Sequence, residues 1–220
     1  MLRDRLRSMT ETTSLTWDET VAVFERRGLP ESSYENLYDE TYDLRPGPLV
    51  IRGALDLGAE DWTQDTGVVV DGDLTVEGNL LTVDDGCPAL IVLGDLKAAD
   101  VYLEGDVKLL VLGSVTVEGA FIGNMTEKLV MIQGDLKAAV TVLSSEFEPD
   151  LIGGTLHGPV LAPAYLDLAQ DVDPAALLVP EVLRAEGDDD SGDLRCFDAP
   201  RVHGGRLLAR IEEGLPVVLG

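Results

Sequence analysis

Few residues of this 220-residue chain have the chemistry of a catalytic centre, and their spacing does not bring them together. The chain has two histidines, His157 and His203. His157 occupies a position that lysine holds in two related segments, which favours a surface role over that of a catalytic base. His203 lies in a turn-forming segment, residues 200–205, with no nucleophile placed near it by any motif. We therefore expect no catalytic residues and no enzymatic activity.

Metal and cofactor sites are not expected either. The two cysteines, Cys87 and Cys196, match no metal-binding spacing, and reduced structural thiols are their expected state. Asp73, Asp95 and Asp135 each follow a recurring glycine and could form a calcium-binding column. Ala, Ser and Thr interrupt that column, so these carboxylates are expected to bond local backbone at a corner of the chain. The glycine pairs lack the spacing of phosphate-binding loops.

The elements that position these residues come from an internal repeat. Two or three aliphatic residues, one variable residue, a glycine, a small or acidic residue and then Leu or Val recur at intervals of 19 to 22 residues. The glycines are Gly53, Gly72, Gly94, Gly113, Gly134 and Gly154. A glycine-punctuated aliphatic period near 20 is typical of a parallel β-solenoid, because glycine permits the backbone angles of a corner.

Aliphatic residues also stand two positions before and two positions after each glycine, so stacked coils would place them in columns inside the solenoid. The first column comprises Ile51, Val70, Val92, Val111, Ile132 and Ile152. The second comprises Leu55, Leu74, Leu96, Val115, Leu136 and Leu156. Further strands are expected near residues 80–81, 101–103, 121–122 and 140–143. An antiparallel sandwich would explain the short strands, but neither the columns nor the near-identical segments 94–99 and 134–139.

The predicted fold is mainly β: a parallel, right-handed β-helix of about six coils with short helical caps at both ends. The helical N-terminal cap and a connecting segment span residues 1–48, the solenoid spans 49–161 and the C-terminal cap spans 162–220. In the first cap, Thr16 and Glu19 form a capping-box pattern, and Gly28 ends the helix. Trp17 and Phe24 of this helix are expected to cover the open first coil.

In the C-terminal cap, short helices are expected at residues 162–169 and 174–183, and a final helix at 205–213. The remainder of both caps is expected to be irregular, including residues 32–48, which contain several tyrosines and acids.

The charge balance of 16 basic against 41 acidic residues gives a net charge of −25. This excess argues against binding to nucleic acid or to anionic membranes, since both require basic surface. No apolar run approaches the ~20 residues of a membrane span, and no secretory signal is visible, so a cytoplasmic location is expected. Two explanations of the acidity are open: solubility or adaptation to a salty cytoplasm, and electrostatic attraction of a basic protein partner.

Acids on the strands and loops of the solenoid are the predicted partner contacts. They are Asp84, Asp85, Glu104, Asp106, Glu127, Glu146 and Glu148.

The repeats at residues 70–76 (VDGDLTV) and 92–98 (VLGDLKA) resemble those of bactofilins, polymer-forming cytoskeletal proteins, over roughly residues 50–160. This resemblance implies a right-handed β-helix that polymerises end to end without nucleotide. Longer coils, helical caps and like-charged rods depart from that pattern. A capped solenoid followed by residues 180–183 and a C-terminal helix also resembles immunity-type proteins of bacterial polymorphic-toxin loci.

The first functional hypothesis is therefore a non-catalytic, immunity-type inhibitor that occludes a toxin or another basic protein. The alternative is a bactofilin-like polymer-forming scaffold, and a carbohydrate- or nucleotide-modifying enzyme is a weaker third hypothesis. A monomer or small oligomer is favoured over a filament, because like-charged rods repel one another.

Overall fold

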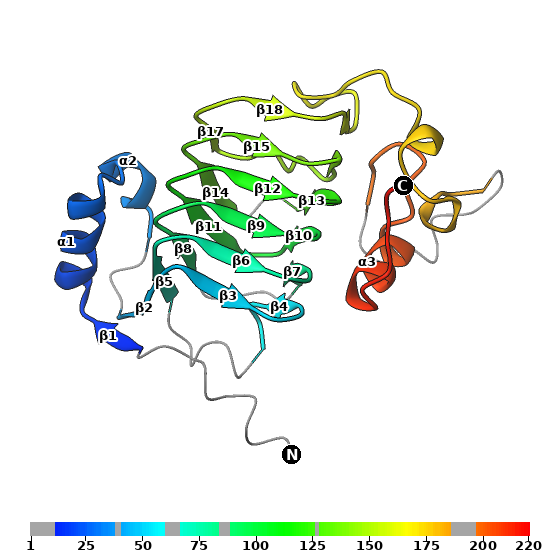
Figure 1. Ribbon diagram of the computed structural model, residues 1–220. Helices are drawn as coiled ribbons and strands as arrows, with labels where there is room; N and C mark the ends of the chain where they lie inside the picture. The colour runs from blue at the N-terminus through cyan, green and yellow to red at the C-terminus, as the bar shows by residue number, and fades with distance from the viewer. Residues whose placement is uncertain (1–11, 38–40, 60–66, 84–88, 126–127, 186–196) are drawn as a thin grey trace, which may run out of the picture.

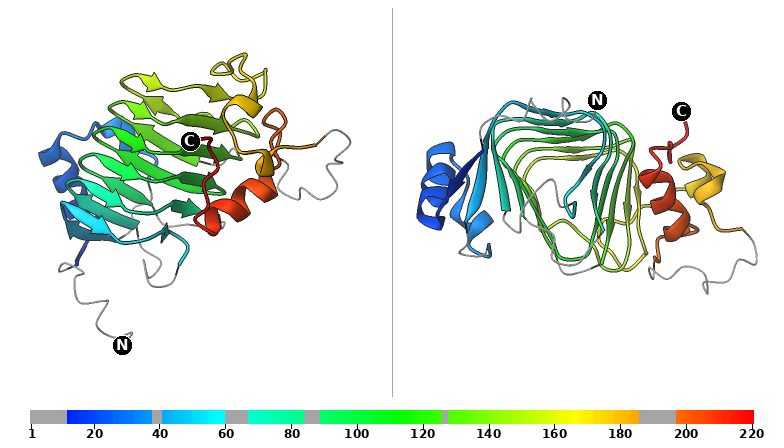
Figure 2. Two further views of the ribbon diagram at one scale, coloured as in Figure 1. Left: turned by 45° about the vertical axis from the view of Figure 1, so that its right-hand side comes forward. Right: turned by 90° about the horizontal axis from the view of Figure 1, so that it is seen from below.

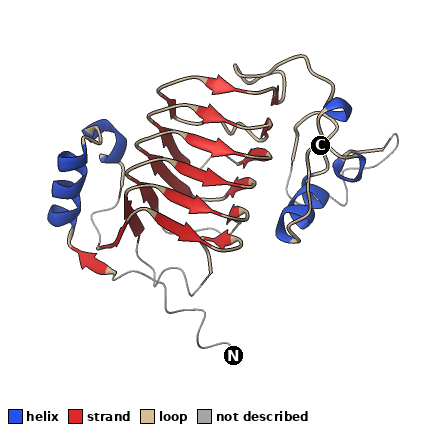
Figure 3. Ribbon diagram, viewed as in Figure 1, coloured by secondary structure: helices blue, strands red, loops and turns tan. Residues whose placement is uncertain are grey.

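The computed structural model describes residues 12–37, 41–59, 67–83, 89–125, 128–185 and 197–220. The chain forms a β-solenoid in which each coil contributes one strand to each of three sheets (Figures 1 and 3). Among the strands of the described residues, every pair between successive coils is parallel, and one antiparallel pair joins β1 to β2 at the start of the first sheet. The predicted mainly β solenoid is thereby confirmed.

Sheet A contains β1 (Thr13–Leu15), β2 (Tyr42–Pro46), β5 (Gly67–Asp71), β8 (Leu90–Val92), β11 (Val107–Val111), β14 (Lys128–Ile132) and β17 (Leu151–Ile152). Sheet B contains β3 (Leu49–Ile51), β6 (Leu74–Val76), β9 (Leu96–Ala98), β12 (Val115–Val117), β15 (Leu136–Lys137) and β18 (Leu156–His157). Sheet C contains β4 (Leu55–Asp56), β7 (Leu80–Thr82), β10 (Val101–Glu104), β13 (Ala120–Asn124), β16 (Val140–Leu143) and β19 (Val160–Leu161).

Alternation along each strand decides which side chains enter the interior. In β6, Leu74 and Val76 point inward and are buried, whereas Thr75 between them points outward and is half-buried. Successive coils repeat this alternation in register, so their inward side chains form one aliphatic cluster that runs through all three sheets. Such stacking of like side chains produces a dry, close-packed core.

The predicted columns are confirmed for five of the six glycines and wrong for the first. Val70 pairs with Val92, and Leu74 pairs with Leu96, as the repeat requires. In the first coil, however, Leu49 rather than Leu55 pairs with Leu74.

The first coil is offset because Gly47, not Gly53, stacks on Gly72. A Cβ added to Gly47 would lie 2.7 Å from the Cα of Gly72, so the two backbones touch at this corner. Arg45, two residues before Gly47, takes the column position beneath Val70. Residues 42–46 thus form a solenoid strand, β2, where the sequence indicated an irregular connection.

The N-terminal helix forms as its sequence predicts. Helix α1 (Trp17–Arg27) begins at the N-cap Thr16, whose side chain exchanges hydrogen bonds with Glu19, and ends at Gly28 in the left-handed conformation. The position of the helix differs from the prediction. Together with α2 (Glu31–Tyr34) it packs against the outer face of sheet A, not over the first coil (Figure 2).

This lateral position follows from the outward residues of sheet A. Val69, Ile91 and Leu110 are apolar although they point away from the interior, and they are buried beneath Phe24 and Tyr34. An exposed apolar sheet face requires a cover, so the N-terminal segment is held at the side of the solenoid.

The C-terminal segment covers sheet C in the same way, on the opposite side of the solenoid (Figure 2). It contains two 3-10 helices, η1 (Pro174–Ala176) and η2 (Pro180–Val182), and the predicted final helix as α3 (Gly204–Glu212). Residues 162–169 form turns instead of the predicted helix. Leu166 in these turns packs into the interior cluster, so this part of the segment does close the last coil.

Sheet B is the one sheet whose outer face carries neither helical segment; it faces the viewer in Figure 1. Among the described residues, no helix is long and apolar enough to cross a membrane.

Candidate binding surface

Three of the acidic residues predicted to contact a partner belong to turns that connect sheet C to sheet A. Asp106 lies between β10 and β11, and Glu146 and Glu148 lie between β16 and β17. Because the strands of successive coils are in register, these turns stack along one edge of the solenoid. We call Asp106, Glu146, Glu148 and the neighbouring Asp150 the acidic edge.

Three other predicted contacts lie outside the described residues: Asp84, Asp85 and Glu127. The remaining predicted contact, Glu104, is buried. The residue is only 8% exposed, and its carboxylate accepts hydrogen bonds from Tyr102 Oη at 2.6 Å and from Asn124 Nδ2 at 3.2 Å. Strand alternation places Glu104 and Tyr102 on the outer face of sheet C, where Tyr102 packs in the cluster formed with the C-terminal segment.

Two carboxylates of the acidic edge are held by neighbouring lysines. Asp106 accepts a hydrogen bond from Lys108 Nζ at 3.0 Å. Asp150 forms an ion pair of 3.2 Å with Lys128, and its other oxygen accepts the Val130 backbone N–H at 2.8 Å. Both lysine side chains are only 11% exposed. These pairs therefore hold the turns themselves, and their carboxylates are largely neutralised by the two lysines.

Glu146 and Glu148 lie in the same turn but differ in their contacts and in their exposure to solvent. Glu148 accepts the backbone N–H of Leu168 at 3.2 Å, which ties the turn to the segment that closes the last coil. Glu146 is exposed, and its backbone has a φ of 63°. The preceding Ser145 has a φ of 52°, so two consecutive non-glycine residues adopt the left-handed conformation. Such backbone is costly and persists only where surrounding contacts hold it.

Those contacts come from the C-terminal segment. Asp198 Oδ1 accepts hydrogen bonds from Ser144 Oγ at 2.9 Å and from the Ser145 backbone N–H at 2.8 Å. The Asp198 backbone N–H in turn donates to Ser144 Oγ at 2.8 Å. Tyr165 Oη donates to the other carboxylate oxygen of Asp198 at 2.5 Å. This clasp joins the turn before β17, the closing segment and the C-terminal segment.

The clasp also determines the protonation of its two titratable groups. Burial acts to raise the pKa of Asp198, but the hydrogen bonds from Tyr165, Ser145 and Ser144 together outweigh it and lower that pKa below its ordinary value. The pKa of Tyr165 is raised by burial first, and then by the hydrogen bond to Asp198 and the negative charges of Asp198 and Glu146. At neutral pH the tyrosine is therefore a neutral donor to a carboxylate.

The outer face of sheet B is a second candidate surface, and threonine and lysine alternate along its central row up to a final histidine. Thr75, Lys97, Thr116, Lys137 and His157 follow one another in register, one per coil. The lysines, the histidine and Thr116 are exposed. The sequence prediction that His157 takes a surface position equivalent to lysine is confirmed.

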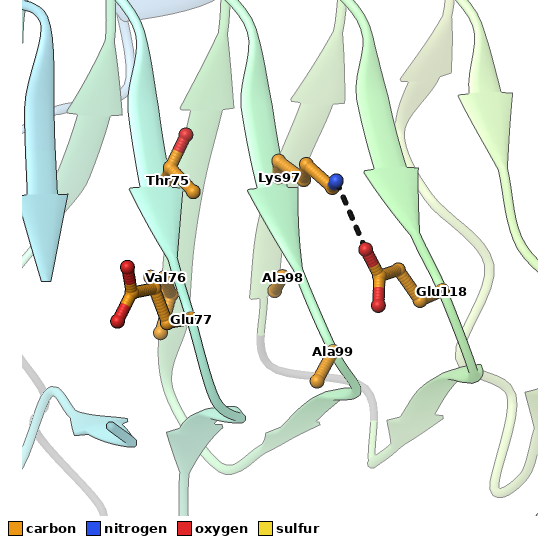
Figure 4. Close-up of a pocket in the computed structure, with 7 residues that line it drawn as sticks. All are labelled: Thr75, Val76, Glu77, Lys97, Ala98, Ala99 and Glu118. Atoms are coloured by element: carbon orange, nitrogen blue, oxygen red, sulfur yellow. Dashed lines mark ion pairs between the residues drawn. The ribbon is translucent and has the colours of Figure 1, made fainter. Parts of the chain in front are cut away.

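A shallow depression of about 200 Å³ lies on this face (Figure 4). Its lining includes Ala98 and Ala99, and the side chains of Glu77 and Glu118 stand on either side. Lys97 crosses this space and pairs with Glu118 at 2.9 Å. Both partners are more than half exposed, so the pair contributes little to stability.

The corner between sheets A and B contains the aspartates that follow the repeat glycines. Asp73 accepts the backbone N–H of Asp95 at 2.9 Å, and Asp95 accepts that of Ser114 at 2.8 Å. Ser114 Oγ accepts the backbone N–H of Asp135 at 3.1 Å, and the Asp135 carboxylate accepts the backbone N–H of Thr155 at 3.0 Å. The aspartates bond backbone at the corner, but the prediction that this backbone is local is wrong, because it belongs to the next coil. Ser114, one of the residues that interrupt the acidic column, therefore preserves the hydrogen-bond ladder.

Near the upper end of this ladder, Asp135 also interacts with two cationic or ionisable side chains. Its Oδ2 lies 3.3 Å from Lys137 Nζ and 3.3 Å from His157 Nε2. The Thr155 backbone hydrogen bond, followed by that from Lys137, lowers the pKa of Asp135 below its ordinary value. His203 has a structural role as well, since its Nδ1 accepts the Arg206 backbone N–H at 3.4 Å and begins α3.

Two residues of the clasp, Tyr165 and Asp198, were not among the predicted contacts. They lie 33 residues apart in the sequence, and no motif links them. The one available signal was an isolated tyrosine in a segment otherwise composed of small and aliphatic residues. Comparisons of the chain with protein families, with curated proteins and with solved structures find no match.

Proposed function

We propose that this protein is a non-catalytic, immunity-type inhibitor that binds a toxin or another basic protein and occludes its surface. The observation that carries the proposal is the stacking of acidic turns into one edge of a rigid solenoid. Asp106, Glu146, Glu148 and Asp150 line this edge. A basic partner would meet several carboxylates that are fixed relative to one another.

Electrostatics supports this reading of the edge. The net charge of −25 creates a negative potential that accelerates encounter with a cationic protein and disfavours anionic ones. Because exposed charges are screened over ~8 Å at physiological salt, the association rate should fall as salt is added. Partner choice would then depend on those carboxylates that are not neutralised by the protein's own lysines.

Glu146 is the residue on which this proposal is best tested. It is exposed at the tip of a turn, whereas Asp106 and Asp150 are paired with lysines. With the basic product of a neighbouring gene as candidate partner, we expect Glu146→Lys to reduce the association rate and weaken binding about tenfold. The size of this effect follows from ~1.4 kcal/mol for one rim charge reversed at low salt.

Glu77→Lys on the outer face of sheet B is the matched control, because Glu77 is also exposed and the substitution changes the net charge equally. The proposal requires that only the Glu146 variant lose binding. Equal losses in both variants would indicate non-specific attraction to an acidic protein, and unchanged binding in the Glu146 variant would remove the edge from the interface.

A bactofilin-like scaffold is the second candidate, and the ends of sheet B favour it. Among the described residues, β3 and β18 each pair with a strand on one side only. Free strand edges can template association with further copies. Sedimentation velocity at low and high salt separates the candidates: a single small species under both conditions excludes the polymer, and concentration-dependent growth supports it.

A further inference from the structure

Tyr165 is the one aromatic residue among the large apolar side chains that remain exposed in the described part of the chain. The residue is 57% exposed although its hydroxyl donates a hydrogen bond of 2.5 Å to Asp198. A tyrosine needed only for the clasp could bury its ring against the solenoid. This ring is instead held outward with its hydroxyl anchored, so it loses little entropy when a partner covers it.

The surroundings of the ring are acidic and rigid. Asp198 binds the hydroxyl on one side. Ser145, whose backbone N–H donates to the same Asp198 carboxylate at 2.8 Å, is followed directly by the exposed Glu146, so Glu146 lies in the turn that is fastened beside the Tyr165 hydroxyl. Both acids are positioned by the left-handed turn at Ser145 and Glu146, and Ser144 fastens that turn to Asp198. An aromatic face bordered by carboxylates is the environment that a guanidinium group prefers, because arginine stacks on aromatic rings and forms forked hydrogen bonds to carboxylates.

We propose that Tyr165 and Glu146 form an arginine-binding anchor, in which a guanidinium of the basic partner stacks on the Tyr165 ring and pairs with Glu146. Asp198 acts as a positioning residue that fixes the ring. The inference rests on the proposed function and names the group that is recognised: the basic partner presents an arginine at the centre of its interface with this protein. Tyrosine and arginine are among the residues that dominate interface energetics.

The anchor can be tested without knowing the partner. The probe is an acetylated triarginine amide, with the equally long tricitrulline peptide as a neutral isostere, titrated at 150 mM salt into protein carrying 13C-labelled tyrosine. We expect saturable shifts of the Tyr165 ring signals with triarginine and none with tricitrulline. The missing signal in Tyr165→Phe assigns the ring.

Affinity measurements of variants complete the test. Tyr165→Ala should weaken triarginine binding about three- to fivefold, the range of an exposed cation–π contact. Glu146→Gln should weaken it by a similar factor, and Glu77→Gln should leave it unchanged. Tyr165 is exposed, so its truncation spares the core, and an unchanged circular dichroism spectrum verifies folding.

Two results would overturn the anchor: equal affinity of the wild type and Tyr165→Ala, or equal shifts with both peptides. These failures are distinguishable from failure of the proposed function. If the basic partner still binds the wild type in a Glu146-dependent manner, the inhibitor proposal stands without the anchor. If no basic partner binds through the acidic edge, the proposed function fails whatever the peptide shows.

Discussion

Two threonines in sheet C have the same environment but opposite hydrogen bonding, and they should respond oppositely to the same substitution. Thr82 and Thr141 both point into the interior of the solenoid and are 0% and 1% exposed. The Thr82 hydroxyl donates to the Glu104 carbonyl at 3.1 Å and accepts the Glu104 backbone N–H at 3.2 Å. The Thr141 hydroxyl, between Phe121 and Val160 in its column, has no hydrogen-bond partner among the described residues.

Thr141→Val should therefore stabilise the protein. Valine has the same branched shape and strand preference, so the change replaces a buried, unpaired hydroxyl by a methyl group. Burial of an unpaired hydroxyl costs about 1–3 kcal/mol. After allowance for packing adjustments, we expect a gain of about 1–2 kcal/mol in the free energy of unfolding. For a chain of this length the gain corresponds to an increase in Tm of about 2–8 °C.

Thr82→Val is the matched control, with an expected loss of about 1–3 kcal/mol because the N–H and carbonyl of Glu104 lose their partner. Urea unfolding followed by circular dichroism measures both variants against the wild type, with equal m-values required for the comparison. The reasoning is refuted if Thr141→Val lowers the urea midpoint, or if the two variants shift it in the same direction.

Two further predictions concern burial and pH. Val92→Asp places an unpaired charge in a fully buried column, so the free energy of unfolding should fall by about 3–5 kcal/mol; Val50→Asp, at a position 54% exposed, should change the urea midpoint little, and similar losses in both would contradict the inward register. Burial raises the pKa of Asp100 above 3.8, against the opposing hydrogen bond from the Ala120 backbone N–H. The folded state thus binds the proton more tightly than the unfolded state, and Asp100 loses its favourable contribution as the pH rises from 3.8 through the raised pKa. Asp100→Asn keeps an acceptor for Ala120 and removes this titration, so its stability relative to the wild type should be higher at pH 7 than at pH 3; a difference that is independent of pH would exclude the mechanism.

Much of the fold could be predicted because its determinants are local or periodic. The alternation of Leu74, Thr75 and Val76 requires no knowledge of distant residues, and neither does the capping box of Thr16 and Glu19. The first coil was predicted in the wrong register for a physical reason. Gly53 follows an aliphatic run like those of the true repeats, but the contact with Gly72 is made by Gly47, and only stacking distinguishes the two glycines.

The candidate site was predictable only in part. The turn acids Asp106 and Glu146 were expected at the surface, and the structure places them on one edge. Glu104 is also acidic and stands at the end of a strand next to such a turn, yet it is buried on the face of sheet C that the C-terminal segment covers. Charge alone does not reveal which acids a later segment of the chain will cover.

The sequence by itself determined a stack of parallel coils, the side chains that fill its interior and the strongly negative charge of the whole, because these depend on residue type and on repeats at short range. The tertiary structure decided which faces of the stack remain open. Apolar outward residues on sheets A and C attract the two terminal segments, and residues 33 positions apart then meet as Tyr165 and Asp198. Such a meeting depends on how distant surfaces pack, for which the linear order of residues carries no local signal.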